Sequence, residues 1–98
     1  MAAYFVFIRE HTTDKTELDI YESLAPTTLE GHKISVLAHY GKHQVLEGAE
    51  AEGVVIAEFP TAREAMAWYD SPEYKRVREH RFRGAEYRAI LVEGLPTQ

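Results

Sequence analysis

The first apolar stretch of the chain, Tyr4–Arg9, is aromatic and β-branched with no polar alternation. Such a run is typical of a strand that is covered on both faces. In the polar segment that follows, Asp14 precedes Glu17 by three residues, which is the spacing of a helix N-cap and a reciprocating acid. Apolar residues then recur every three or four positions, so they predict an amphipathic helix that packs on the sheet. This apolar stripe comprises Leu18, Tyr21, Leu24 and Ala25.

Four further segments of the sequence are predicted to form strands. Ile34–Tyr40 alternates strictly, so its even-numbered residues are expected on one face and its odd-numbered residues on the other. Gln44–Glu47 is expected to form a short edge strand before a loop rich in glycine and glutamate. Val54–Phe59 predicts the next strand, which Pro60 ends because proline cannot donate to a sheet. Tyr87–Glu93 predicts the last strand.

Two helices are predicted between the last two strands. Thr61 and Glu64 have the spacing of a capping box, in which threonine and glutamate satisfy each other's helix-end groups. Ser71 can cap a further helix with Pro72 at its first position, and this helix is expected over Glu73–Arg83. The buried stripe of the earlier helix is expected to contain Ala62, Ala65, Met66 and Tyr69.

The order strand, helix, strand, strand, helix, strand predicts an α+β fold. It is the ferredoxin-like βαββαβ plan with an antiparallel sheet, in a single domain over residues 1–98. This plan places the helices on one face of the sheet and leaves the other face uncovered. Because the strands are apolar on both faces, the open face needs a second cover. A second copy of the chain, packed sheet to sheet, would supply it and form a dimeric α/β barrel.

Composition narrows the classes of partner. With 98 residues, of which 45% are hydrophobic, the chain has the size of one compact domain. The formal net charge of −5 argues against binding to nucleic acid through its phosphates. The chain has no cysteine, which excludes a disulfide framework and a thiolate metal site and is consistent with the cytoplasm. No segment has the length of a membrane span, so we expect a cytoplasmic protein that binds no membrane.

Several short motifs together carry a family resemblance. They are Leu46-Glu47-Gly48, Glu58-Phe59-Pro60, the run from Trp68 through Tyr69-Asp70-Ser71-Pro72-Glu73 to Tyr74, Arg81, and Val92-Glu93-Gly94. With these motifs the chain resembles the bacterial family known as domain of unknown function 1330. The resemblance implies a homodimeric ferredoxin-like fold of the dimeric α/β barrel superfamily and no agreed reaction. Superfamily relatives include cofactor-independent monooxygenases, muconolactone isomerases and haem-degrading enzymes, but a shared fold does not transfer a reaction.

Two candidate catalytic residues lie at strand ends. His39 could act as a general base, with Tyr40 beside it as a hydrogen-bond donor to a ligand. Where the family commonly carries Arg-Gly-Gly, this chain has His39-Tyr40-Gly41. Because adjacent residues of a strand point to opposite faces, His39 and Tyr40 are not expected to line one pocket without a bulge. Glu58 shares a strand face with Val54 and Ile56, so burial would raise its pKa and make it an acid or base. Alternatively, it is a sheet-end carboxylate that pairs with an arginine or accepts hydrogen bonds from backbone amides.

The candidates for substrate binding are Tyr74, Arg81, Tyr40 and Trp68. Arg81 belongs to a basic stretch whose charges complement a helix C-terminus, and it could instead hold a ligand carboxylate or pair with an acid across the dimer. Trp68 is expected mainly to pack in the core, whereas Tyr74, beside the Ser-Pro break, is the more plausible pocket residue.

Metal and cofactor signatures are missing from the sequence. Gly41 interrupts the spacing of His39 and His43, so no metal site is expected, and no nucleotide-binding loop is present. Three hypotheses follow. The chain is a homodimer that binds or transforms a small organic acid or aromatic molecule in a pocket between sheet and helices. Alternatively, it is a non-catalytic binding or structural module, or a monooxygenase-like enzyme by analogy with the superfamily.

Overall fold

The structure is a computed structural model that describes residues 1–96 of the 98-residue chain. Along the chain, the first strand is followed by two helices, two strands, two further helices and the last strand. The elements are β1 (Ala3–Thr12), α1 (Lys15–Leu24), the short 3₁₀ helix η1 (Ala25–Leu29), β2 (Ser35–His39), β3 (Gly53–Phe59), α2 (Ala62–Tyr69), α3 (Pro72–Gly84) and β4 (Ala85–Glu93). This order confirms the predicted α+β, ferredoxin-like plan.

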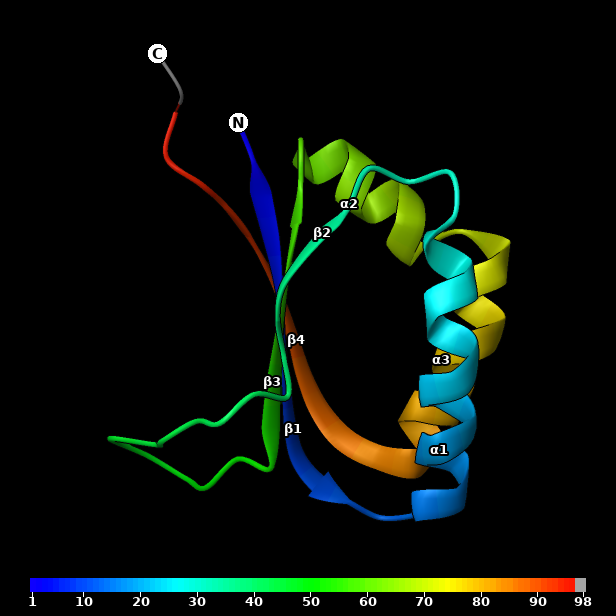
Figure 1. Cartoon of the computed structure of the whole chain (residues 1–98), viewed down its shortest axis with the longest axis vertical. Coiled ribbons are helices and arrows are strands. Elements are labelled where there is room, and N and C mark those ends of the chain that lie inside the picture. Colours follow the sequence, from blue (N-terminus) through cyan, green and yellow to red (C-terminus); the bar gives the residue numbers. More distant parts are fainter. Residues whose placement is uncertain (97–98) are drawn as a thin grey trace.

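The four strands form one sheet in the order β2-β3-β1-β4, and every neighbouring pair is antiparallel. All helices lie on one face of the sheet, and the other face is open (Figure 1). The predicted edge strand Gln44–Glu47 is wrong, because residues 41–52 have no regular secondary structure. They form an arm that projects from the sheet on its open side (Figure 1).

Side-chain caps begin the three α-helices where the sequence predicts them. The Asp14 carboxylate accepts a hydrogen bond from the Glu17 amide N–H at 3.3 Å. The Thr61 hydroxyl accepts one from the Glu64 amide N–H at 3.1 Å, and the Ser71 hydroxyl accepts one from the amide three residues later at 3.2 Å. Each cap satisfies an amide that has no partner within its helix.

Helices α1 and α3 lie side by side, and this packing redirects Glu17. Its carboxylate does not return to the helix start, as predicted, but accepts hydrogen bonds from His80 and Arg83 on α3. At the end of α3, a Cβ atom on Gly84 would lie only 2.7 Å from the backbone nitrogen of Leu18. The close approach of the two helices therefore requires glycine at this position.

Two predicted stripe residues are exposed. Leu24 is 40% exposed and Met66 is 38% exposed, whereas Trp68 is only 4% exposed. The chain passes from α1 into η1 directly after Leu24, with Pro26 in the first turn of η1, so the last turn of α1 does not continue the stripe. The eight-residue α2 buries Ala65 and Trp68 instead of Met66. The predicted burial of Leu24 and Met66 is therefore wrong.

A bulge in β2 changes which of its residues face the helices. Val36 lies opposite Ala57 on the helix side, and Ala38 lies opposite Ile56 on the open side. The register shifts between Val36 and Ala38, and His39 returns to the helix side. The predicted strict alternation over this strand is wrong, because a bulge places two residues of one strand against one of its partner.

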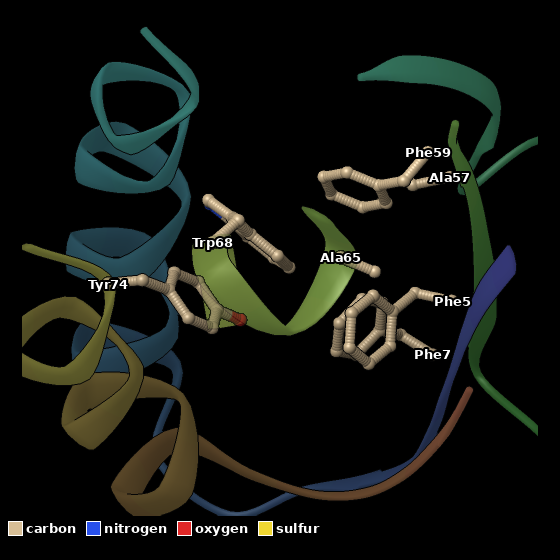
Figure 2. Close-up of a cluster of buried hydrophobic side chains, with 7 residues drawn as sticks. All are labelled: Phe5, Phe7, Ala57, Phe59, Ala65, Trp68 and Tyr74. Carbon is tan, nitrogen blue, oxygen red and sulfur yellow. The ribbon is translucent and has the colours of Figure 1, made fainter. Parts of the chain in front are cut away.

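The core lies between the sheet and the helices and is rich in aromatic rings. The indole of Trp68 lies between ring systems from both layers, with ring centroids 5.7 Å from Phe59 and 4.0 Å from Tyr74. Figure 2 shows Trp68 and Tyr74 reaching from the helical layer toward the phenylalanine rings of the sheet. The cluster comprises Phe5, Phe7, Ala57, Phe59, Ala65, Trp68 and Tyr74.

The open face of the sheet carries a continuous set of apolar side chains. Charged residues also face this side, among them Glu58 opposite Tyr4 and Arg88 opposite Ile8, toward opposite ends of the strands. No helix in the described residues is long and apolar enough to cross a membrane. The apolar members of the open face are Val6, Ile8, Ala38, Val54, Ile56, Ile90 and Val92.

Candidate ligand-binding site

A cavity of about 350 Å³ lies between the sheet and the helical layer. Its wall comes from the helix-facing sides of β1, β2 and β3 and from α1, η1 and α2. The volume is within the range of pockets that hold small organic molecules. Most of the wall is apolar, with Phe7, Ala25, Leu29, Val36, Val55 and Trp68 among its residues.

Few residues of the wall have polar side chains. They are Tyr21, Glu22, His39 and Tyr40. The indole N–H of Trp68 is not free, because it donates a hydrogen bond of 3.1 Å to the Thr28 hydroxyl. The cavity therefore offers aromatic faces and a small number of hydrogen-bonding groups, which is the usual composition of a site for a small organic ligand.

Tyr40 is held at the end of β2 by contacts from three other strands. Its backbone is left-handed, with φ of 53°, which is rare for a residue with a side chain. Its ring packs on Gly53 and lies 4.7 Å below the Arg9 guanidinium, and its hydroxyl shares a short hydrogen bond with that of Tyr87. Burial and the bond to Tyr87 raise the pKa of the Tyr40 hydroxyl, so it remains a protonated donor.

Behind the wall formed by α1 lies a second pair of tyrosines. The hydroxyls of Tyr21 and Tyr74 are 2.8 Å apart and share a hydrogen bond. Burial raises the pKa of both hydroxyls, and the positive charge of Arg81 opposes that rise at Tyr74. Tyr21 lines the cavity, whereas Tyr74 has no exposed surface and is not part of the wall.

Arg81 lies in the same buried region and is only 2% exposed. Its guanidinium is surrounded by aromatic rings, with centroids 5.3 Å away for Phe7, 5.1 Å for Tyr87 and 6.0 Å for Tyr21. Its Nε and Nη2 atoms have no hydrogen-bond partner among the described residues. A buried cation whose neighbours are rings and hydroxyls thus lies behind the wall of the cavity.

The sequence of the whole fold matches a known family. The model of the domain of unknown function 1330 (DUF1330) matches residues 2–95, from β1 to the segment after β4. The chain belongs to the DUF1330 family. The resemblance that the sequence motifs indicated is therefore confirmed. No curated protein matches the chain.

Solved structures with low sequence identity to this chain share its fold. A protein of unknown function from Rhodopseudomonas palustris has a TM-score of 0.73 at 17% identity, over 98% of this chain and 84% of that one. A dimeric ferredoxin-like protein of unknown function from Bacteroides fragilis has a TM-score of 0.59 at 13% identity, over 95% and 96%. A protein from Nitrosomonas europaea, provisionally described as an antibiotic biosynthesis monooxygenase, has a TM-score of 0.61 at 11% identity, over 96% and 90%.

The DUF1330 fold divides the predicted site residues among three places. His39, Tyr40 and Trp68 line the cavity, and the left-handed backbone of Tyr40 allows two neighbouring residues to face it together. Tyr74 and Arg81 lie behind the cavity wall. Trp68 packs in the core, as expected, and also lines the cavity, whereas Tyr74, which was expected to be the pocket residue, is fully buried and does not line it.

Glu58 lies on the far side of the sheet from His39. It borders a separate hollow of about 410 Å³ with Lys33 and Ser35, and it raises the pKa of the neighbouring Tyr4 hydroxyl. Since His39 faces the helices and Glu58 faces away from them, the two predicted catalytic residues do not belong to one site within the chain.

Sequence reasoning missed several residues of this DUF1330 site. Tyr21 was visible only as a member of an apolar stripe, and Tyr87 only as the start of a strand. Arg9 lies 3.5 Å from the carboxylate of Glu22, which lines the cavity, and 3.1 Å from that of Glu52. Each of these missed residues is an arginine or a tyrosine within or beside an apolar segment of the sequence. This polar group in an apolar setting is the signal that could have identified them.

Proposed function

We propose that this DUF1330 protein binds a small, largely apolar aromatic molecule in the cavity between its sheet and its helices, and that it acts as a homodimer. The observation that carries the binding proposal is an aromatic-walled cavity of about 350 Å³. A dry cavity of roughly 150 Å³ is large enough to hold benzene, so this one has room for a substituted single ring. Phe7 and Trp68 offer ring faces for stacking.

Any reaction in the cavity would rely on His39 rather than on Glu58. Only His39 of the two predicted catalytic residues lines the cavity, where an imidazole can accept or donate a proton. The resemblance to the protein from Nitrosomonas europaea, at 11% identity, concerns the fold. We therefore propose that the protein binds its ligand without catalysis. The alternative is an enzyme in which His39 catalyses a reaction of the bound ligand.

Titration with neutral aromatic molecules tests the binding proposal. Benzamide, phenylacetamide and benzyl alcohol are added to the purified full chain, and binding is followed by calorimetry and by the fluorescence of Trp68, which is the sole tryptophan. We expect saturable binding. A wild-type chain that shows no saturable heat and no thermal stabilisation with any of these compounds or their carboxylate counterparts would overturn the proposal.

A matched pair of substitutions locates the bound molecule. Ala25 lines the cavity, whereas Ala67 on α2 is exposed to solvent. Ala25→Phe should fill part of the cavity and reduce affinity at least tenfold, and Ala67→Phe should leave affinity unchanged. Equal affinities for the two variants would place the ligand elsewhere on the protein.

The open apolar face of the sheet supports the homodimer. A monomeric protein rarely exposes a large continuous apolar surface, and here Ile90 is 39% exposed and Val92 is 50% exposed. The arm of residues 41–52 projects on the same side, where a second copy would meet it (Figure 1), and its Leu46 is 81% exposed. The dimeric state described for the ferredoxin-like protein from Bacteroides fragilis also supports it.

Light scattering tests the assembly. We expect the wild-type chain to have a mass twice its 11.2 kDa at micromolar concentration. Ile56→Glu would place a charge in the centre of the open face and should give a monomer, whereas Ile20→Glu, on the exposed side of α1, should remain a dimer. Circular dichroism confirms that both variants are folded. A monomeric wild-type chain would contradict the proposal.

A further inference from the structure

Arg81 is a buried charge without an acidic partner. It is 2% exposed, and no carboxylate in residues 1–96 lies within ion-pair distance of it. By contrast, Arg83 pairs with Glu17 at 3.2 Å, and Arg78 lies 3.9 Å from Asp70. Charged side chains are almost never fully buried unless they are paired. Arg81 is therefore the exception that needs a physical explanation.

The aromatic rings around Arg81 compensate only part of the cost of its burial. Phe7, Tyr21 and Tyr87 place their ring centroids 5.1–6.0 Å from the guanidinium carbon. A cation–π contact is weaker than the hydration that a buried cation loses. In addition, Nε and Nη2 remain without hydrogen-bond partners. A complementary anion is the group that this environment lacks.

The cavity is the place from which an anion could approach this charge. Phe7 and Tyr21 both line the cavity and both flank the guanidinium, so Arg81 lies one side chain behind the wall. The hydroxyl of Tyr21 bonds to that of Tyr74, beside Arg81. Because a charge acts over a longer range where water is excluded, Arg81 makes this end of the cavity electrically positive.

The acidic groups near the cavity do not cancel this charge. Glu22 lines the wall, but its side chain is 41% exposed and lies 3.5 Å from Arg9. Glu52 bonds to the same Arg9 at 3.1 Å and to the Thr12 hydroxyl. Both acids are thus placed at the solvent-facing side and engaged with Arg9. The positive charge that has no acidic partner in residues 1–96 is therefore that of Arg81, in the interior of the protein.

We propose that Arg81 selects ligands that carry one carboxylate, so that the natural ligand is an aromatic monocarboxylic acid bound with its acidic group at the Tyr21 end of the cavity. This inference rests on the proposed function and specifies its ligand class. The Tyr21 hydroxyl would donate to the carboxylate, and the Arg81 charge would stabilise it, directly or through the tyrosine pair. The apolar part of the ligand would contact the apolar residues of the wall, such as Val36 and Leu29.

Isosteric pairs of compounds test the inference without any substitution. Benzoate is compared with benzamide, and phenylacetate with phenylacetamide, by calorimetry on the wild-type chain. We expect each carboxylate to bind at least tenfold more tightly than its amide. If the amides bind as tightly as the carboxylates, the inference is wrong and the proposed function stands. If none of the four compounds binds, both fail.

Three variants then identify the source of the selectivity. Arg81→Met replaces the buried cation with an apolar chain of similar length and should remove the preference for carboxylates while amide binding remains. Tyr21→Phe retains the ring but not the hydroxyl and should weaken carboxylate binding several-fold. Arg78→Met, on the same helix, should leave the preference unchanged. Retention of the full preference in folded Arg81→Met would show that Arg81 is structural.

Discussion

The ring of Tyr40 lies directly on Gly53, so that a Cβ atom at Gly53 would come within 2.4 Å of Tyr40 Cδ1. The Arg9 guanidinium lies over the same ring, 4.7 Å from its centroid, and the Tyr40 hydroxyl shares a hydrogen bond with that of Tyr87. The contact therefore joins the end of β2 to β3, β1 and β4. It holds Tyr40 in its left-handed conformation, with φ of 53°, where it contributes to the cavity wall.

Gly53→Ala should destabilise the fold because the new methyl group and the Tyr40 ring cannot occupy the same space. We expect a loss of about 1–3 kcal/mol, the usual cost of overpacking. Urea denaturation of the wild-type and variant chains measures it. In a Tyr40→Ala background the same substitution should cost much less, as in any double-mutant cycle between contacting residues. Equal costs in both backgrounds would contradict the steric account.

Gly84→Ala should be at least as harmful, since its Cβ would lie 2.7 Å from the nitrogen and 2.9 Å from the Cα of Leu18. Backbone atoms cannot rotate away, so α1 and α3 would have to separate. We expect a loss of about 3 kcal/mol, measured by chemical denaturation. Gly41→Ala is the matched control, because nothing lies within 4 Å of its Cβ position and its stability should change little.

Thr28→Val should leave the indole N–H of Trp68 buried without an acceptor. An unsatisfied buried donor costs about 1–3 kcal/mol, and the emission of the single tryptophan should report the changed environment. Thr27→Val is a close control: both hydroxyls donate at 2.7 Å to a carbonyl three residues earlier, but that of Thr27 is exposed and serves no indole. If the two variants lose equal stability, the Trp68 bond contributes nothing.

The Glu17 cluster predicts a dependence of stability on pH. The hydrogen bond from His80, and then Arg83, lower the pKa of Glu17 in the folded protein. A lowered carboxyl pKa stabilises the fold at pH values above the unfolded pKa of about 4.3, and this contribution is lost as the pH falls through the folded value. Glu17→Gln should therefore be less stable than the wild type at pH 6, and the difference should shrink toward pH 3.

Denaturation curves at several pH values check this expectation. Asp19→Asn serves as the control, because within residues 1–96 Asp19 pairs only with the exposed Lys15 on the same helix. Its effect on stability should be small throughout. A difference between wild type and Glu17→Gln that grows on acidification would have the wrong sign and would refute the role assigned to the cluster.

Local chemistry made much of the fold predictable from the sequence. A helix cap needs only residues two or three positions apart, so Asp14, Thr61 and Ser71 specify helix starts before any tertiary contact forms. Apolar strands and the order of the elements then limit the arrangement to one plan. The same reasoning failed at β2, because a bulge between Val36 and Ala38 reverses the alternation on which it depends.

The sequence by itself determined the family, the ferredoxin-like plan and the need for a cover on the open face of the sheet. The tertiary structure alone decided which candidates share a site: it brought His39, Tyr40 and Trp68 to one cavity and placed Glu58 on the other face. It also surrounded Arg81 with rings from β1, α1 and β4. These contacts join residues that are far apart in the chain, so neither periodicity nor spacing records them; they arise only when the helices pack on the sheet.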